Sequence, residues 1–364
     1  MKMSMDSLLG KLVNERLAEP TLWIVDENLD SDSLLCAQAR PDLHIISNRF
    51  DIAAALSGNG HSVTLCDFDF SLLPVSHYAR IVYRVSKERM LVHHCINESY
   101  RHLQAGGQLH LLGAKDDGIK THGRNAERVF GKSGGVKKHG TLYQANLTRP
   151  EADSPAQWLD SNDYSQLRTC EAGGMPFISK PGIFGWNKLD RGSVLLAEQA
   201  LAVLSGATLT QASPSDAASR APTSGGLGSV LDLGCGYGYL LLATAGLPFS
   251  SRTATDNNAA AVTAAEANFD QRELAVTVTL DDCGAQLQEQ FDVILCNPPF
   301  HHGFSTSGDL SQKFIDSIRR LLRSTGVALL VVNQFIAVER LAAGQFARVE
   351  TLVSADGFKV VALS

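Results

Sequence analysis

The feature that most constrains the fold is a rhythm of short apolar runs that occurs twice along the 364 residues. Runs of this length are typical of buried strands. In the first half they lie at 21–29, 43–48, 62–68, 79–85 and 107–113. In the second half they lie at 229–234, 252–256, 274–280, 291–297 and 327–333. Helix-like segments separate most of them. Strands that alternate with helices favour right-handed crossovers and a mostly parallel sheet.

The helices and the chain end of the second half can also be predicted. Helical patterns cover 237–246, 257–269 and 307–326. The second should be capped by Asn257 or Asn258, and the third should end at Gly326. Residues 346–363 then form two apolar runs around a turn at Gly357. This pattern predicts an antiparallel hairpin at the edge of the sheet.

The two halves correspond most closely late in each series. ARIVYRVSKERM (79–90) precedes a helix and then YRHLQAGGQLHLLG (100–113). In the same way, FDVILCNPPFHH (291–302) precedes a helix and then IRRLLRSTGVALLVVN (318–333). The correspondence favours an internal duplication over two unrelated domains. The predicted fold class is α/β, with two tandem Rossmann-like domains.

The expected domain boundaries follow changes in composition. Residues 1–150 form the first domain, and 151–210 form a connecting segment with a loop and a helix. Residues 211–229 are rich in Ala, Ser, Pro and Gly, which predicts a flexible insertion. Residues 230–364 form the second domain.

Composition excludes several classes of protein. No run of about 18 apolar residues is present, so no membrane span is expected, and the first 17 residues contain no apolar signal core. The seven cysteines form no C-x-x-C pair, which argues against structural zinc and against a disulfide framework. A cytoplasmic protein without a metal fits these features best.

Charge is distributed unevenly between the halves. The net charge is −6, but residues 1–150 carry 18 basic and 16 acidic side chains. Seven of the basic residues and only one acid lie within 120–149, including Lys132, Lys137 and Lys138. Such a local patch can attract phosphate even when the whole chain is acidic. A solvated basic loop is the alternative explanation.

A glycine run marks the candidate ligand site. LDLGCGYGYL (231–240) lies between a strand and a helix, with glycines at 234, 236 and 238. Glycines there let the backbone pass close beneath a ligand. The spacing is not the dinucleotide pattern G-x-G-x-x-G. Asp232 can reach an amino group, and Asp256, at the end of the next strand, is placed to accept ribose hydroxyls.

Two further acids, Asp281 and Asp282, follow the third strand of the second half. An Asp at this place can accept a hydrogen bond from an adenine amino group, and Asp282 is the candidate. A solvated acidic turn remains the alternative. The fourth strand ends in NPPF (297–300), with two histidines directly after it.

The order of these motifs resembles a known family. LDLGCGYG, TD, DC and NPPF after successive strands are the signature order of class I S-adenosylmethionine-dependent methyltransferases that act on planar amino groups. FDVILCNPPFHHGFSTS (291–307), KPGIFGWNKLDRGSVLL (180–196) and the degenerate first half are similar to the RsmC type. Members of this type are bacterial 16S ribosomal RNA guanine-N2 methyltransferases. The resemblance implies S-adenosylmethionine as cofactor and 16S ribosomal RNA as partner, within a small-subunit particle, for a monomeric enzyme.

The resemblance also implies roles for individual residues. Asn297 and the Pro298 carbonyl would accept hydrogen bonds from the base amine, Pro299 would stiffen the turn, and Phe300 would stack on the base. The guanine must be unpaired or flipped out to reach them. The candidate cofactor-binding residues are Asp232, Gly234, Cys235, Gly236, Gly238, Asp256, Asn257, Asp282, Cys283 and Asn297.

The first half lacks both signatures. It has RVSK (84–87) where the second has NPPF, and its first strand is followed by no glycine run. We expect that half to bind no cofactor. It would act as a structural brace, and it would bind RNA through Lys132, Lys137 and Lys138. His301 is a further candidate for RNA contact.

Three other functions remain open from the sequence. A large-subunit ribosomal RNA guanine-N2 methyltransferase would share the NPPF-H pattern. An adenine-N6 or protein-glutamine methyltransferase would use a similar Asn-Pro-Pro-aromatic motif. A non-catalytic RNA-binding or folding factor would keep the fold with a vestigial site, although the intact motifs argue against it.

Overall fold

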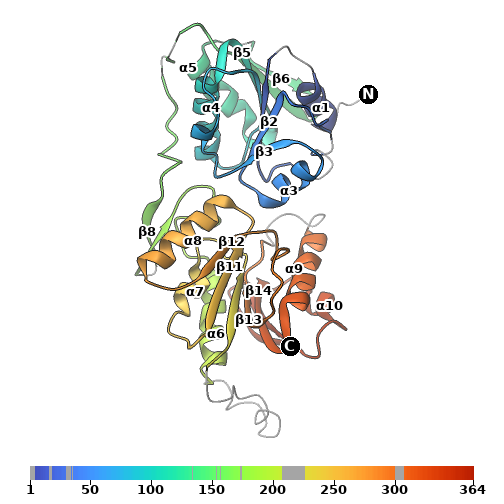
Figure 1. Ribbon diagram of the computed structural model, residues 1–364, viewed down its shortest axis with the longest axis vertical. Helices are drawn as coiled ribbons and strands as arrows, with labels where there is room; N and C mark the ends of the chain where they lie inside the picture. The colour runs from blue at the N-terminus through green and yellow to red at the C-terminus, as the bar shows by residue number, and fades with distance from the viewer. Residues whose placement is uncertain are drawn as a thin grey trace. The chain divides into compact units, whose positions relative to one another are not determined.

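The computed structural model describes residues 5–15, 19–29, 34, 36–132, 134–152, 154–155, 157–172, 174–206, 226–299 and 307–364. These residues form two compact units (Figure 1). Unit 1 consists of residues 1–167 and 180–182, and unit 2 of residues 168–179 and 183–364. Phe300, His301 and most of the expected insertion at 211–229 lie outside the described residues.

Unit 1 is built around a seven-stranded sheet with the order β3-β2-β1-β4-β5-β7-β6. Its strands are β1 (Thr21–Val25), β2 (Leu43–Ser47), β3 (Ser62–Leu65), β4 (Tyr78–Arg84), β5 (Leu103–Ala114), β6 (Val136–His139) and β7 (Leu142–Thr148). Its helices are α1 (Met5–Asn14), α3 (Phe50–Gly58), α4 (Arg89–His102) and α5 (Ile119–Phe130), with short 3-10 turns η1 (Phe70–Leu72) and η2 (Lys115–Asp117).

Unit 2 contains a second seven-stranded sheet, with the order β12-β11-β10-β13-β14-β16-β15. Its strands are β10 (Ser229–Leu233), β11 (Ser251–Asp256), β12 (Thr277–Leu280), β13 (Phe291–Cys296), β14 (Leu322–Asn333), β15 (Val349–Ala355) and β16 (Phe358–Leu363). Its helices are α6 (Arg191–Leu204), α7 (Tyr239–Ala243), α8 (Ala259–Gln271), α9 (Ser307–Leu321) and α10 (Val338–Ala342). A separate hairpin joins β8 (Arg168–Ala172) to β9 (Met175–Ser179).

The two sheets have the same topology. In each, five parallel strands follow one order and an antiparallel hairpin completes the edge. The identical order supports the internal duplication and the tandem Rossmann-like fold predicted from the sequence. The hairpin β6–β7 of unit 1 was not anticipated, because its two lysines, Lys137 and Lys138, interrupt the apolar pattern of a short edge strand.

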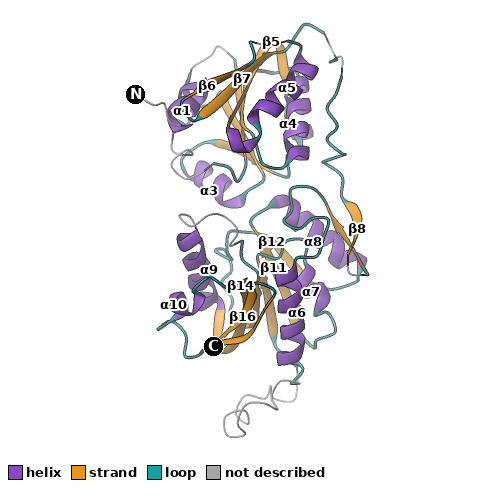
Figure 2. Ribbon diagram, turned by 180° about the vertical axis from the view of Figure 1, so that it is seen from behind, coloured by secondary structure: helices purple, strands orange, loops and turns teal. Residues whose placement is uncertain are grey.

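Both faces of the second sheet are buried. On one face lie α6, α7 and α8 (Figure 2). Their side chains pack on alternate strand residues such as Val293 and Leu295. On the other face, α9 and α10 pack on the intervening residues, such as Ile294 and Cys296. A strand buried on both sides reads as a continuous apolar run, as these do. None of the helices in the described part of the chain is long and apolar enough to cross a membrane.

The chain between the sheets contributes to both units. Asn268 of α8 holds β9, because its amide donates to the Ile178 carbonyl at 2.7 Å and accepts from the Ile178 amide at 2.6 Å. Residues 180–182 then return to unit 1. There the buried Lys180 pairs with Asp67, which also accepts a hydrogen bond from Tyr164 at 3.0 Å. The sequence pattern did not predict that residues 180–182 belong to unit 1 while the residues on either side belong to unit 2.

The expected helix 307–326 is shorter in the structure. It ends at Leu321, and β14 begins at Leu322. Gly326 therefore lies within a strand rather than at a helix end. A Cβ at this position would be 2.8 Å from the Asp292 carbonyl oxygen. Close approach of β14 to β13 explains why a glycine stands there.

The tight contact at Gly326 predicts a stability effect. Gly326→Ala should lower the free energy of unfolding of unit 2 by about 1–3 kcal/mol, the usual cost of overpacking. Chemical denaturation measures this difference. Gly246→Ala is the control, because no heavy atom lies within 4 Å of the added carbon there. Equal stability of the two variants would contradict the packing argument.

Candidate active site

The candidate site lies at the carboxyl ends of the parallel strands of unit 2. The strands β12, β11, β10, β13 and β14 are neighbours and run in the same direction. Their carboxyl ends therefore share one edge of the sheet, where ligands of open α/β sheets bind. A pocket at this edge is lined by Phe184, Gly185, Asp190, Ser193, Gly234, Cys235, Gly236, Tyr237, Tyr239, Leu240 and Asn297.

This pocket brings together only part of the residue set predicted from the sequence. Gly234, Cys235, Gly236 and Asn297 line it. The other described residues of unit 2 that were predicted lie at the same edge: Asp232 within β10, Gly238 directly before α7, Asp256 at the end of β11, Asn257 after it, Asp282 and Cys283 after β12, and Pro298 and Pro299 after β13. The predicted Lys132, Lys137 and Lys138 belong to unit 1. Sequence reasoning missed the aromatic residues of the lining and the two polar residues at the start of α6. The glycine-aromatic strings KPGIFGW and GYGY were the signal for the aromatic ones.

The glycine run forms a tight loop between β10 and α7. Gly234, Gly236 and Gly238 all have positive φ values, of 81°, 56° and 88°. Side chains other than hydrogen are strained in this region. At Gly238 a Cβ would also lie 2.5 Å from the Phe269 ring, whereas at Gly236 nothing lies within 4 Å. The loop is therefore tightly packed at Gly238, whereas the space next to Gly236 is open.

The loop is anchored to the neighbouring strand. The amides of Gly234 and Cys235 both donate to the Thr255 carbonyl at 2.9 Å. The amide of Gly236 donates to Oδ2 of Asp256, also at 2.9 Å. Burial raises the pKa of the Cys235 thiol well above its ordinary value, so the thiol stays neutral. Cys235 thus acts as a small packing residue and not as a nucleophile.

Asp256 is held rigidly at the end of β11. Its Oδ2 accepts the Gly236 amide and its Oδ1 accepts the Asn258 amide, each at 2.9 Å. The half-buried carboxylate keeps further lone pairs for a ligand. Asn258 rather than Asn257 caps α8, because its side chain accepts the Ala260 amide at 3.0 Å.

Neither carboxylate oxygen of Asp232 forms a hydrogen bond of good geometry with the described residues, although the Leu241 backbone amide is close enough to lower its pKa slightly. Asp232 is fully buried in β10. Burial, with a smaller contribution from the charge of Asp256, raises the pKa of Asp232 to about 8. Buried polar groups almost always have a partner. The unpaired carboxyl therefore suits a donor from a ligand, and a cationic donor would favour its ionised form.

The structure distinguishes the two acids after β12. Asp281 is fully buried, and its two oxygens accept the amides of Asp282 at 2.7 Å and Gln286 at 3.0 Å. Asp281 therefore holds the loop in shape. Asp282 is partly exposed and forms an ion pair with Lys313 of α9. Cys283 follows with a φ of 52°, which turns the chain sharply after Asp282.

Asn297 follows β13 and is fixed by the start of α6. Its Nδ2 donates to Oδ2 of Asp190 at 2.9 Å and to Oγ of Ser193 at 2.7 Å. Pro298 is buried and Pro299 is exposed. The segment KLDRGSVLL was noted in the sequence only as part of a resemblance. Its Asp at a helix start was a capping signal, but nothing local pointed to Asn297, more than 100 residues away.

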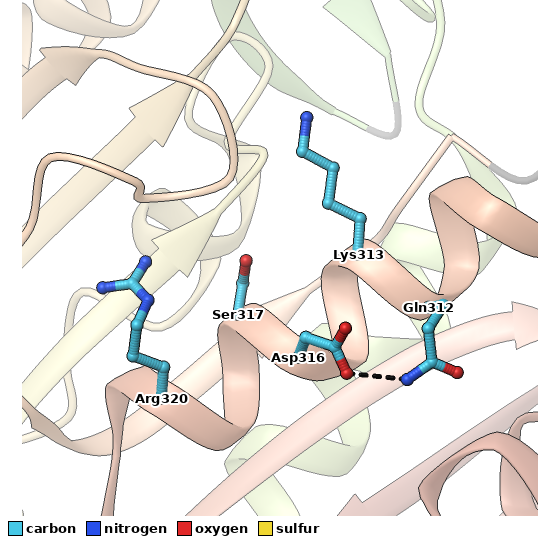
Figure 3. A pocket seen from close by; sticks show the side chains of 5 residues that line it. All are labelled: Gln312, Lys313, Asp316, Ser317 and Arg320. Carbon is cyan, nitrogen blue, oxygen red and sulfur yellow. Dashed lines mark hydrogen bonds between the residues drawn. The ribbon is translucent and has the colours of Figure 1, made fainter.

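A second hollow lies on α9, lined by Gln312, Lys313, Asp316, Ser317 and Arg320 (Figure 3). Its side chains come from one helix and several are already engaged. Gln312 donates to Asp316 at 2.6 Å, and Lys313 pairs with Asp282. Arg320 donates to the carbonyls of Gly284 and Leu287. These contacts indicate a structural surface, so we assign the chemistry to the pocket at the strand ends.

No group of His, Cys, Asp and Glu side chains within the described ranges could hold a metal ion. All seven cysteines are free thiols. The polar groups that gather at the strand ends are instead carboxylates and backbone amides. They are suited to binding a ligand with hydroxyl and amino groups.

Comparison with known proteins agrees with this geometry. The N-terminal methyltransferase small-domain model matches residues 13–162, and the methyltransferase small-domain model matches residues 218–362. Ribosomal RNA small subunit methyltransferase C of Shewanella loihica is 26% identical over 302 residues, which is 82% of this chain and 80% of that protein. The Pseudomonas putida protein of the same name is 28% identical over 290 residues, 79% of each chain.

A solved structure resembles the whole chain. The 16S rRNA N2 guanine methyltransferase RsmC of T. thermophilus, in complex with AdoMet and guanosine, has a TM-score of 0.79 and 25% identity. The match covers 99% of this chain and 91% of that one. The fold and the strand-end site thus define a methyltransferase with two tandem Rossmann-like domains. Within that class, the chain belongs to the RsmC family of ribosomal RNA methyltransferases.

The raised pKa of Asp232 predicts a pH effect on stability without ligand. An acid with a raised pKa binds its proton more tightly in the folded state, so stability falls as pH rises from about 4 to about 8. Asp232→Asn should flatten this fall and match the parent protein near pH 4, where both side chains are neutral. Chemical denaturation across this pH range measures it. Parallel curves for the two proteins would show that Asp232 does not titrate as stated.

Proposed function

We propose that this protein transfers a methyl group from S-adenosylmethionine to the N2 amino group of a guanine in 16S ribosomal RNA. One observation carries the proposal: the glycine loop and Asn297 line the same pocket. A cofactor-binding loop and an acceptor for an amine are therefore adjacent. The names of the curated relatives and the guanosine complex of the T. thermophilus protein support the same reaction.

The residues present fit S-adenosylmethionine. The loop 234–238 is open above Gly236, as a close backbone approach requires. Asp256 would accept the ribose hydroxyls, Asp282 the adenine amino group, and the unpaired Asp232 would face the amino group of the methionine part. Cys235, Asn257 and Cys283 would complete the surroundings. The bound cofactor supplies an activated methyl group.

The chain's own residues prepare the amine. An exocyclic amine is a poor nucleophile, because its lone pair is delocalised into the ring. Oδ1 of Asn297 and the Pro298 carbonyl would accept its two N–H groups and draw the lone pair out of conjugation. The nitrogen releases one proton to solvent after it has gained the methyl group, so no strong base is needed. Pro299 stiffens the turn, and Phe300, outside the described residues, would stack on the base.

Unit 1 is proposed to bind RNA and no cofactor. Where β10 is followed by the glycine loop, β1 is followed by Asp26. This buried carboxyl accepts the Tyr83 hydroxyl at 3.2 Å and the Asn28 amide at 2.9 Å. Burial raises the pKa of Asp26 to about 7. The position after the first strand is therefore occupied by a hydrogen-bonded side chain in unit 1 and by glycine in unit 2.

The proposed RNA-binding surface of unit 1 consists of the β6–β7 hairpin and the loop before it, which carries Lys132, and is called the basic hairpin below. Lys132, Lys137 and Lys138 are exposed. The ammonium groups of Lys120 and Lys138 lie 4.8 and 6.0 Å from the centre of the Tyr143 ring. Cations beside an aromatic face suit phosphate contacts with a stacked base nearby. His301 is kept as a further proposed RNA contact.

Several finer features complete the proposal. The substrate would be ribosomal RNA within a small-subunit particle, the enzyme would act as a monomer in the cytoplasm, and no metal would take part. Residues 1–150 would form the degenerate domain and residues 230–364 the catalytic one. The segments 151–210 and 211–229 would lie between them in sequence, with α6 of the first segment packed on the catalytic sheet.

The direct test is methyl transfer by the purified protein. Radiolabelled S-adenosylmethionine would be incubated with naked 16S RNA, small subunits and large subunits, and the labelled nucleoside identified by mass spectrometry. N2-methylguanosine in the small-subunit RNA is the expected product. Label on large-subunit RNA, on adenine or on protein would replace the proposal by another transfer reaction. If no substrate became labelled, a non-catalytic RNA-binding or folding factor would be the remaining explanation.

Asp256 gives a prediction for cofactor binding. Asp256→Ala should weaken S-adenosylmethionine binding by about 1.5–3 kcal/mol, the scale of hydrogen bonds to a charged group. Titration calorimetry would then show a Kd raised by about 10- to 150-fold. Asp270→Ala, on the exposed side of α8, is the matched control and should bind normally. Unchanged affinity of the Asp256 variant would remove this residue from the site.

The basic hairpin gives a prediction for RNA binding. Reversal of Lys132, Lys137 and Lys138 to Glu should raise KM for RNA. It should also flatten the slope of log K against log salt by about 2–3, since each phosphate contact contributes about 0.7–0.9. Cofactor affinity should not change. The exposed Lys11, changed to Glu, serves as a control. A normal KM with an unchanged salt slope in the triple variant would contradict the proposed RNA-binding role of these lysines.

A further inference from the structure

We propose that Asp190 and Ser193 are positioning residues that fix the orientation of the Asn297 amide. This inference rests on the proposed function, in which Oδ1 of Asn297 accepts a hydrogen bond from the base amine. The two ends of an amide group are similar in shape but opposite in hydrogen bonding, because the oxygen accepts and the nitrogen donates. A flipped Asn297 would turn a donor towards the amine. Catalysis therefore requires one orientation of this side chain.

The carboxylate of Asp190 selects that orientation. An ionised carboxylate has acceptor oxygens only. Its Oδ2 lies 2.9 Å from Nδ2 of Asn297. If the amide flipped, its oxygen would face the carboxylate oxygen at the same distance, and the two would repel each other. Nδ2 must therefore point to Asp190, and Oδ1 must point away from it.

Ser193 completes the arrangement. Its hydroxyl donates its one hydrogen to Oδ2 of Asp190 at 3.3 Å. Towards Asn297 the hydroxyl can then only accept, and it lies 2.7 Å from Nδ2. An amide nitrogen carries two hydrogens, and Asp190 and Ser193 use both. Oδ1 is the end of the side chain that remains for the substrate.

Asp190 is itself held by the fold. It is the N-cap residue of α6, where its Oδ2 accepts the Ser193 amide at 2.8 Å. Gly192 leaves room for this carboxylate, because a Cβ there would lie 3.1 Å from Oδ2. Leu196, Ala197 and Ala200 fix α6 on the sheet. The position of the Asn297 amide thus depends on a helix that begins more than 100 residues earlier.

A simpler explanation is that Asp190 only caps α6. The two explanations are separated by Asp190→Ser. Serine is as good a cap as aspartate, so the helix should keep its stability. Its shorter hydroxyl retains a local cap but loses the carboxylate contact with Asn297. Ser193→Ala tests the second acceptor without changing the cap residue.

The decisive experiment is a double-mutant cycle with steady-state methyl transfer as readout. Asp190→Ser should lower kcat by about 10- to 100-fold, the effect of a misplaced catalytic group, with KM for RNA and cofactor affinity unchanged. Asn297→Ala alone should lower kcat by at least about 100-fold. In the Asn297→Ala background, Asp190→Ser and Ser193→Ala should each change kcat by less than about 2-fold, because their effect passes through Asn297.

Arg191→Ala, an exposed neighbour at the start of α6, should leave kcat unchanged. An equal loss from Asp190→Ser in both backgrounds would overturn the inference, because Asp190 would then act independently of Asn297. An unchanged kcat for Asp190→Ser in the parent background would overturn it as well.

A second measurement separates this inference from the proposed reaction. In protein labelled with 15N at Asn residues, the side-chain amide signal that Asn297→Ala removes belongs to Asn297. Its protons should exchange slowly with solvent, and Asp190→Ser should make that exchange faster. If the parent protein methylated no guanine, this signal would still test the orientation. Fast exchange in the parent protein would refute it.

Discussion

The site depends on the burial of both faces of the central parallel strands of unit 2. Val293 and Leu295 pack against one helical layer, and Ile294 and Cys296 against the other. A one-residue shift of β13 would exchange these sets between the two layers and also move Asn297. Because packing fixes the register, the strand ends and the residues after them lie in fixed places. The apolar contacts of β13 therefore position the polar residues that follow it, including Asn297.

Sequence patterns predicted the parts of this arrangement that are local. The strand runs, the glycine loop and Asp256 are each recognisable within about ten residues, and the strand order repeats. The pattern did not predict features that depend on contacts far along the chain. Gly326 resembled a helix end, yet its neighbour is the Asp292 carbonyl. The link from Asp190 to Asn297 spans 107 residues, and no short motif records it.

The two units have the same fold but differ in the loop that follows the first strand of each sheet. Their sheets have the same strand order, so the same edge exists in both. In unit 2 the loop after the first strand has three glycines with positive φ, and a ligand can approach its backbone. In unit 1 the residue directly after the first strand is Asp26, whose buried carboxyl accepts a hydrogen bond from Tyr83. The duplicated fold alone therefore does not imply a second cofactor site.

Charge explains why the proposed enzyme would need both units. The strand-end site gathers carboxylates, with Asp232 and Asp256 close enough for the charge of one to raise the pKa of the other. Such a site suits a ligand with a cationic sulfonium and an amino group, but it repels the phosphates of RNA. The exposed lysines of β6 lie on the other unit. In the proposed function, separate surfaces would let the acidic pocket hold the cofactor while the basic hairpin binds the nucleic acid, and the repeated fold would provide the scaffold for that second surface.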